Sequence, residues 1–160
     1  MNNEIEVGIR AAQPNDAGAM LAMLKQLQTE SDFFELDTEL DQVSAASEAR
    51  QIELLNSSGT NLILLATAGT QLIGIATVQQ VSDVTGEVGV AVLNDYQGMG
   101  LGTMLVDELL NWQLHYSELQ RLVLEVKKVN LPAIHIYHKL GFKQQSETNT
   151  TIWMQKDSEN

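Results

Sequence analysis

Residues 88–106 read VGVAVLNDYQGMGLGTMLV, and this stretch decides the fold of the chain. The apolar run at its start predicts a buried strand, and the apolar residues after the glycines predict the first turns of a helix. Three alternating glycines, Gly98, Gly100 and Gly102, leave backbone N–H groups uncovered by side chains at this junction. Such groups bind anions together with the positive end of a helix dipole, so the stretch predicts a site for a phosphate or pyrophosphate.

The spacing of the glycines excludes two familiar phosphate-binding motifs. A dinucleotide-binding fold requires Gly-x-Gly-x-x-Gly, and counting from Gly98 its third glycine falls at Thr103. A P-loop requires a lysine directly after its last glycine, and no lysine lies between Lys25 and Lys127. The pattern that remains is QxxGxG over residues 97–102. It resembles the acyl-CoA pyrophosphate loop of the GNAT superfamily of N-acetyltransferases.

The length and composition are those of one globular domain. With 160 residues and an apolar fraction of 44%, we expect a single domain over residues 1–160. The longest aliphatic run, at 62–66, is too short to span a bilayer, and the first residues carry no signal-peptide pattern. The absence of cysteine excludes a disulfide framework and a cysteine nucleophile. We therefore expect a cytoplasmic protein with no membrane association.

The charge distribution divides the chain into an acidic and a basic region. A net charge of −12 argues against a nucleic-acid partner, because a phosphate backbone requires a basic footprint. Residues 1–60 hold eleven acids against three bases. Residues 121–156 hold two acids against six bases: Arg121, Lys127, Lys128, Lys139, Lys143 and Lys156. An anionic cofactor suits the basic region and a cationic substrate the acidic one, with ordinary solvated surface charge as the alternative.

The hydrophobic periodicity predicts the order β, α, α, β, β, β, α, β, α, β, β, a mixed α/β (α+β) domain without repeats. The expected strands are 7–11, 62–67, 71–81, 87–93, 121–126, 142–147 and 150–154. The expected helices begin at Pro14, at about Asp41, after the glycine turn and at Asn130, and residues 29–41 are expected to form a loop. This is the order of the GNAT family. The resemblance implies a mostly antiparallel central sheet, splayed parallel strands at the cofactor site and helices on both faces.

The resemblance implies acetyl-CoA as the bound cofactor, with its pantetheine arm between strands 87–93 and 121–126. The cofactor-binding residues are then Val90, Val92, Gln97, Gly98, Met99, Gly100, Leu101, Gly102, Thr103 and Asn130. Met99 departs from the family pattern, since lysine or arginine is common at its position. Lys127 and Lys128 are the candidates for extra phosphate contacts.

A second motif, N-x-x-A-x-x-x-Y-x-x-x-G-F over residues 130–142, is similar to the family's second cofactor motif. The resemblance implies that Tyr137 protonates the leaving thiolate, and a phenol with a pKa near 10 is protonated at neutral pH. The alternatives are a packing role for Tyr137 and a plain N-cap for Asn130. Glu87 is the candidate general base, acting through water, with an exposed acid at the start of a strand as the alternative. His135 and His138 lack further ligands for a metal, so we expect no metal site.

The prediction of the acceptor rests on the acidic loop, because the corresponding loop commonly lines the acceptor side of the site in this family. Its candidate substrate-binding residues are Glu30, Asp32 and Phe33. We expect acetyl transfer to a primary amine of a small, cationic molecule. The alternatives are a protein N-terminal or lysine acetyltransferase, a non-catalytic acyl-CoA-binding sensor and, disfavoured by the glycine spacing, a nucleotide-binding protein. The strand pair over residues 142–154 is a candidate surface for a homodimer.

Overall fold

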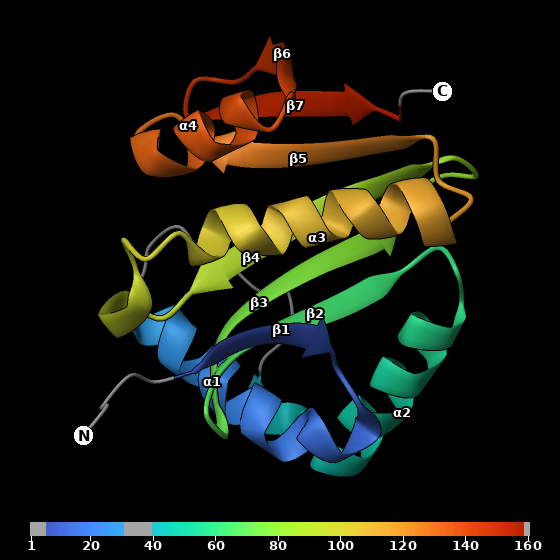
Figure 1. Ribbon diagram of the computed structural model, residues 1–160, viewed down its shortest axis with the longest axis vertical. Helices are drawn as coiled ribbons and strands as arrows, with labels where there is room; N and C mark the ends of the chain where they lie inside the picture. The colour runs from blue at the N-terminus through green and yellow to red at the C-terminus, as the bar shows by residue number, and fades with distance from the viewer. Residues whose placement is uncertain (1–5, 31–39, 159–160) are drawn as a thin grey trace.

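The computed structural model describes residues 6–30 and 40–158, which form one seven-stranded sheet with helices on both faces (Figure 1). Its helices are α1 (Ala17–Glu30), α2 (Ala45–Ser57), α3 (Leu101–Tyr116) and α4 (Leu131–Lys139). Short 3-10 turns cover Pro14–Asp16, Leu40–Gln42 and Asn94–Tyr96. The strands are β1 (Val7–Ala11), β2 (Leu62–Ala68), β3 (Gln71–Gln80), β4 (Thr85–Val92), β5 (Arg121–Lys127), β6 (Lys143–Glu147) and β7 (Thr151–Asp157).

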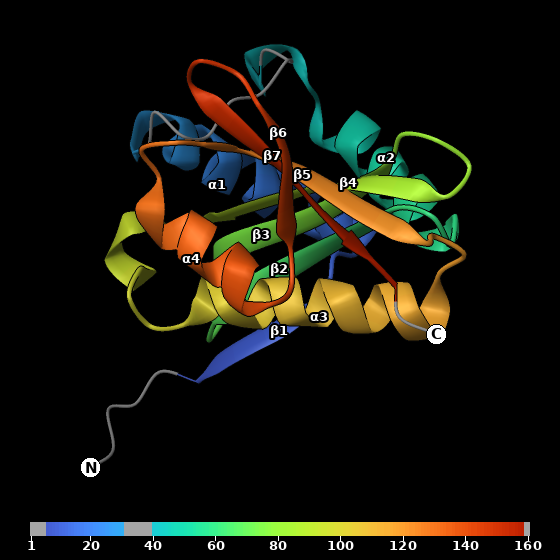
Figure 2. The ribbon, with the colours of Figure 1, turned by 90° about the horizontal axis from the view of Figure 1, so that it is seen from above.

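The strand order is β1-β2-β3-β4-β5-β7-β6, and every neighbouring pair is antiparallel except β4 and β5. Seen from above, α3 and α4 lie on one side of the sheet and α1 and α2 on the other (Figure 2). The predicted fold class is therefore confirmed, including the single parallel pair. β6 lies at one edge with all five residues exposed. The homodimer predicted at this edge stays a prediction.

The parallel strands β4 and β5 are paired at one end only. Thr85, Gly86 and Glu87 pair with Arg121, Leu122 and Val123, and no pairing continues beyond them although both strands do. Gly86 lies at this closed end, where an added Cβ would be 2.5 Å from Val78 Cγ1 and 2.8 Å from Leu119 Cδ1. Only glycine allows this close packing. The two strands separate after Glu87 and leave a gap between their carboxyl-terminal halves.

The core forms on both faces of the sheet because each helix presents an apolar stripe to it. Met20 and Leu27 of α1 and Ile52 of α2 are buried on one side, and Leu105 and Leu109 of α3 on the other. None of the helices within residues 6–30 and 40–158 combines the length and apolar character that a membrane span requires.

Several strand ends differ by one or two residues from those that the sequence predicts, and β4 begins at Thr85 rather than at residue 87. The prediction that the second helix begins at Asp41 is wrong: α2 begins at Ala45, because Ser44 Oγ accepts a hydrogen bond from Ser47 N at 3.1 Å and caps it. The first helix continues to Glu30, past the expected end, and residues 31–39 lie outside the described part. β7 extends to Asp157, which pairs with Arg121 through backbone register and a 2.9 Å ion pair.

Candidate active site

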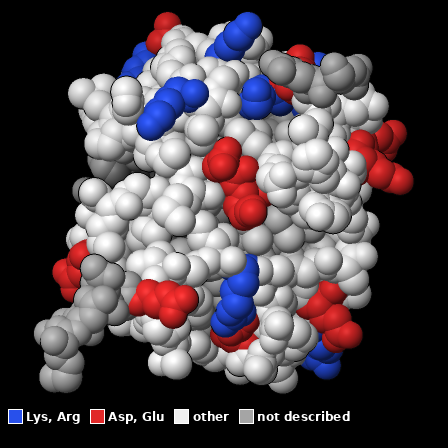
Figure 3. Space-filling model, in the orientation of Figure 1, with Lys and Arg blue, Asp and Glu red and all other residues white. Residues whose placement is uncertain are grey.

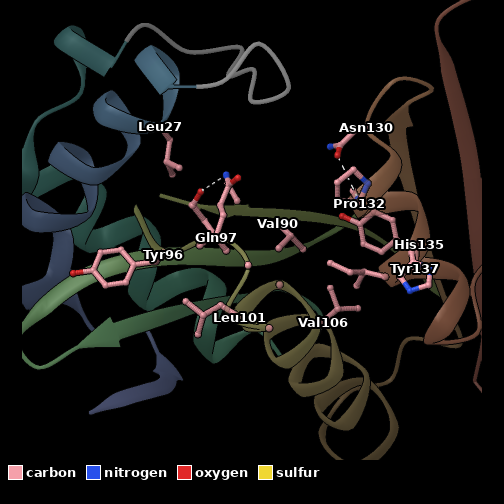
Figure 4. Close-up of a pocket in the computed structure, with 17 residues that line it drawn as sticks. Leu27, Val90, Tyr96, Gln97, Leu101, Val106, Asn130, Pro132, His135 and Tyr137 are labelled. Atoms are coloured by element: carbon pink, nitrogen blue, oxygen red, sulfur yellow. Dashed lines mark hydrogen bonds between the residues drawn. The ribbon is translucent and has the colours of Figure 1, made fainter. Parts of the chain in front are cut away.

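Two cavities meet at the gap between β4 and β5. The first, which we name the glycine-loop cavity, has a volume of about 630 Å³ and lies between the start of α3 and α4 (Figure 4). Eight of the ten predicted cofactor residues line it: Val90, Val92, Gln97, Gly98, Gly100, Leu101, Gly102 and Asn130. Met99 and Thr103 do not line it, and the Met99 side chain is 56% exposed. The binding roles of all ten stay predictions.

The glycine loop keeps the N-terminus of α3 open. Gly98 and Gly100 adopt φ values of 80° and 81°, a conformation that disfavours every L side chain. Gly100 is the N-cap of α3, and no side chain caps the helix there. Gln97 Nε2 donates to Val92 O at 3.1 Å and to Asn94 Oδ1 at 3.2 Å, which fastens the loop to the end of β4. An anion can therefore approach the first backbone N–H groups of α3.

Gly102 brings α3 close to α4. A Cβ at this position would lie 3.2 Å from Ile136 Cδ1, so glycine allows the two helices to approach beside the cavity. Within α4, Asn130 Oδ1 accepts a hydrogen bond from Ala133 N at 3.3 Å, and Pro132 occupies the first turn, where its missing N–H costs nothing. Asn130 is thus both the N-cap of α4 and a wall of the cavity.

The lining of the glycine-loop cavity carries little charge. Among the described residues around it there is no lysine, arginine, aspartate or glutamate. Neither lysine proposed for phosphate contacts lines it: Lys127 lines the second cavity, and Lys128 Nζ pairs with Glu147 Oε2 at 2.6 Å. His135 is exposed and also lines this cavity. Basic side chains gather instead over the β5–β7 and α4 part of the molecule (Figure 3).

Tyr137 is shared by both cavities. Its side chain is only 8% exposed and makes an edge-to-face contact with Phe142, with ring centroids 5.8 Å apart. Figure 4 shows the ring extending from α4 toward Val90 on β4. Burial raises the pKa of Tyr137 to about 12, because the phenolate is poorly solvated there. The phenol is therefore fully protonated at neutral pH.

The second cavity, which we name the carboxylate cavity, has a volume of about 550 Å³ and shares Val90, Ala91, Asn130 and Tyr137 with the first. Three carboxylates from three elements line it: Glu48 of α2, Glu87 of β4 and Glu125 of β5. Lys127, Thr77 and Thr151 add polar groups. Thr151 Oγ1 donates to Glu125 Oε2 at 2.7 Å, and burial raises the pKa of Glu48.

The predicted catalytic pair thus lies in one cavity, and the predicted acceptor residues do not. Glu87 and Tyr137 both line the carboxylate cavity. Glu30 lines neither cavity: its carboxylate accepts a hydrogen bond from Asn94 N at 2.7 Å and so holds the turn before the glycine loop. Asp32 and Phe33 lie outside the described residues.

Sequence reasoning missed Glu48, Glu125 and Thr151. Alternation along β5 carries a signal for Glu125, because Leu122, Leu124 and Val126 are buried and the intervening side chains lie on the other face. The helical pattern around Glu48 predicts only a solvent-exposed acid. That Glu48 lines the cavity follows from how α2 packs on the sheet, which the local sequence does not indicate. No group of three or more His, Asp or Glu side chains able to hold a metal occurs within residues 6–30 and 40–158.

Comparison with known proteins identifies the family. The model of the acetyltransferase (GNAT) family matches residues 21–142. The chain belongs to the GNAT acetyltransferase family. The resemblance drawn from the glycine loop and the Asn130–Phe142 motif is therefore confirmed, and with it the expectation of an N-acetyltransferase family.

Curated relatives are N-acetyltransferases with different acceptors. The chain is 36% identical to the [ribosomal protein bS18]-alanine N-acetyltransferase of Haemophilus influenzae over 92 residues, which is 57% of this chain and 62% of that protein. It is 38% identical to the spermidine N(1)-acetyltransferase of Escherichia coli over 61 residues, 38% of this chain and 33% of that protein. The chain thus spans only between about a third and about three fifths of the curated relatives it matches.

Solved structures share the whole architecture. A GNAT-family acetyltransferase from Streptococcus pneumoniae superposes with a TM-score of 0.87 at 26% identity, covering 95% of this chain and 99% of that one. The PaiA N-acetyltransferase of Thermoplasma acidophilum, solved in complex with coenzyme A, superposes with a TM-score of 0.76 at 18% identity, covering 96% and 99%. The second likeness concerns the fold alone.

Proposed function

We propose that the protein is an acetyl-CoA-dependent N-acetyltransferase that transfers the acetyl group directly to a primary amine of a small, cationic acceptor. The observation that carries the proposal is the meeting of the two cavities at Tyr137, in the gap between β4 and β5. One cavity offers backbone N–H groups to an anion, and the other offers carboxylates to a cation. Family membership supports the reaction class.

The residues of the glycine-loop cavity fit acetyl-CoA. The positive φ of Gly98 and Gly100 and the open N-terminus of α3 form a cradle for the pyrophosphate. Beyond Glu87 one edge of β4 pairs with no strand of the described residues, so the backbone at Val90 and Val92 can bond the pantetheine amides. Asn130 lies across the gap as a further contact. When bound, acetyl-CoA supplies an acetyl group activated as a thioester.

Two side chains handle the protons in this proposal. Tyr137 Oη holds a proton at the gap and donates it to the departing thiolate. Glu87 removes the proton of the attacking amine through a water molecule. The amine must be neutral to attack, and Glu87 lines the same cavity as Tyr137, so the base and the acid can act on one bound acceptor. Glu125 lies in that cavity as well and is the second carboxylate to test.

The acceptor is proposed from the charge of the carboxylate cavity. Glu48, Glu87 and Glu125 favour a cation there, and the matched spermidine acetyltransferase acts on a small amine by name. A protein N-terminus is the second candidate, because the bS18-alanine acetyltransferase of Haemophilus influenzae aligns over a longer part of this chain. We place the protein in the cytoplasm, since its cysteine-free sequence carries no mark of an oxidising compartment.

Thermal unfolding with acetyl-CoA, beside matched ATP and NAD controls, tests the cofactor. At about 100 times the dissociation constant, acetyl-CoA should stabilise the fold by about 2.7 kcal/mol. Release of free thiol with a panel of amines then tests the enzyme. Stabilisation by ATP or NAD instead would contradict the proposal, and binding of acetyl-CoA without turnover of any amine or peptide would favour a non-catalytic sensor.

A further inference from the structure

The carboxylate of Glu30 joins α1 to the turn that leads into the glycine loop. Its Oε1 accepts a hydrogen bond from Asn94 N at 2.7 Å, although the two residues lie 64 positions apart in the chain. Its Oε2 accepts a hydrogen bond from Gln26 Nε2 at 2.8 Å, one helical turn earlier. Both oxygens of the carboxylate are therefore bound, and the side chain has a fixed orientation toward the turn.

The local sequence does not favour an acid at this position. Glu30 is the last residue of α1, and the last turn of this helix holds no basic residue. The helix dipole opposes a negative charge at the carboxyl end of a helix. The contact with Asn94 offsets this effect: Asn94 is the first residue of the 3-10 turn, and the N-cap residue Leu93 has no side-chain hydrogen bond to the N–H groups there.

From Asn94 the contacts continue into the glycine loop. Asn94 Oδ1 accepts a hydrogen bond from Gln97 Nε2 at 3.2 Å, and the same nitrogen donates to Val92 O at 3.1 Å (Figure 4). Gln97 lines the glycine-loop cavity and directly precedes Gly98, whose φ is 80°. A continuous series of hydrogen bonds therefore runs from the end of α1 to the start of the loop.

The glycine loop has few other contacts that fix its conformation. No hydrogen bond joins Gly98 or Met99 to another described residue, and glycine loses more conformational freedom on ordering than any other residue. A loop that samples several conformations binds its ligand more weakly, in proportion to the fraction of molecules in the binding conformation. The hydrogen bonds at Asn94 and Gln97 therefore affect how large this fraction is.

We propose that Glu30 is a positioning residue for the cofactor: through Asn94 and Gln97 it holds the glycine loop in the conformation that binds the pyrophosphate of acetyl-CoA. This inference rests on the proposed function and adds to it a residue that lines neither cavity. Loss of the Glu30 carboxylate should weaken the binding of acetyl-CoA and leave the chemical step unchanged.

Isothermal titration calorimetry with acetyl-CoA, in the absence of an acceptor, tests the inference. In Glu30→Ala the dissociation constant should rise by about tenfold, as expected for the loss of a charge-assisted hydrogen bond. In Glu30→Gln it should stay within about threefold of the wild type, because the amide oxygen can still accept from Asn94 N. Steady-state kinetics of Glu30→Ala should show the same rise in KM for acetyl-CoA, with kcat unchanged.

Asp16→Ala is the matched control, just before the other end of α1. Asp16 Oδ2 also accepts a backbone hydrogen bond of 2.7 Å, from Gln13 N, and Asp16 lines neither cavity. The variant also loses the ion pair with Arg10, so its thermal midpoint should fall by a similar amount to that of Glu30→Ala, or by more. Its dissociation constant for acetyl-CoA should stay within about twofold of the wild type, because the change is remote from the loop.

Asn94→Ala tests the series one step further along and leaves α1 intact, so the inference remains testable if Glu30→Ala does not fold. It keeps the backbone N–H that Glu30 binds and removes the Oδ1 that Gln97 binds. The dissociation constant should rise by about threefold, the effect of a neutral hydrogen bond. In the double variant the rise should be smaller than the product of the two single effects, because contacts in one series depend on one another.

The outcomes separate the inference from the proposed function. A dissociation constant of Glu30→Ala within about twofold of the wild type would overturn the inference and leave the acetyltransferase intact. An equal rise in Asp16→Ala would overturn it as well, because general loss of stability would then explain both. A double variant with the full product of the two effects would overturn the series through Asn94. Failure of acetyl-CoA to bind the wild type would remove the proposed function and the inference with it.

Discussion

The two cavities that meet at Tyr137 differ in the groups that they offer to a charged ligand. The glycine-loop cavity has no acidic residue, lysine or arginine among its described walls and offers backbone N–H groups, whereas the carboxylate cavity is lined by three glutamates. A protein with a net charge of −12 can therefore present a local site for an anion without a basic patch at that site. Ligand binding in the glycine-loop cavity depends on backbone conformation, and ligand binding in the carboxylate cavity depends on side-chain identity. Different substitutions should therefore weaken the two.

The largest expected effect comes from Tyr137, one of the residues that line both cavities. Tyr137→Phe keeps the ring contact with Phe142 and removes the proton donor, so kcat should fall by about 100- to 1,000-fold. The dissociation constant of acetyl-CoA should stay within about twofold, because the backbone cradle is unchanged. Tyr116→Phe, at a 73% exposed position, is the control. An unchanged kcat would assign Tyr137 to packing alone.

Replacing one glutamate of the carboxylate cavity should change the kinetics with the amine and leave the binding of acetyl-CoA unchanged. Glu87→Gln should lower kcat/KM for the amine by about 100-fold if this residue removes the amine proton, with acetyl-CoA affinity unchanged. Steady-state kinetics with saturating acetyl-CoA measure the loss. The same measurement on Glu125→Gln provides the comparison: a larger loss there than in Glu87→Gln would transfer the role of the base to Glu125.

The pKa of about 12 for Tyr137 predicts a late alkaline titration. This folded value lies above the value near 10 in an unfolded chain, so stability is unaffected below about pH 10 and falls as pH rises from there through about 12. The phenolate absorbance of the wild type minus that of Tyr137→Phe isolates this group. A difference titration centred near pH 10 would show that the hydroxyl is solvated and contradict its burial.

A smaller effect is expected from the backbone of the glycine-loop cavity. Gly100→Ala forces a side chain into φ 81°, at a cost of about 1–2 kcal/mol, and should raise the dissociation constant of acetyl-CoA by about tenfold. Gly59→Ala is the matched control. Gly59 has a similar φ of 78°, an added Cβ there would meet no atom within 4 Å, and the residue does not line the cavity. Isothermal titration calorimetry gives both constants. Equal affinity in the two variants would mean that the loop conformation is not needed for the cofactor.

The fold was predictable where local patterns are strong. The apolar strand, the glycine turn and the helix after it share one stretch of sequence, and Asn130 with Gly141 marks the two ends of α4. The start of α2 was missed because Asp41 and Ser44 are both acceptable N-cap residues, and in the structure Asp41 lies in a 3-10 turn while Ser44 caps the helix.

The site was predictable only where one segment builds it. Eight predicted cofactor residues line one cavity because the glycine loop and the end of β4 are continuous in the chain. The three glutamates and Thr151 of the carboxylate cavity instead come from α2, β4, β5 and β7, and no single segment indicates that Glu48 and Thr151 line the same cavity. The hydrogen bond between Glu30 and Asn94 was not predictable for the same reason, since the two residues lie 64 positions apart in the chain.

The short pairing between β4 and β5 has a consequence for cooperativity. In the sheet ladder of the described residues, three residue pairs join the four strands β1–β4 to the three strands β5–β7. Helix α3 packs on β2, β3 and β4 and also contacts α4. Without ligand, the two groups of strands can open as separate units with their own opening free energies. A ligand that bonds both strand edges of the gap joins them. Native-state amide hydrogen exchange should then report two protection levels in the free protein and a single, higher one in the complex.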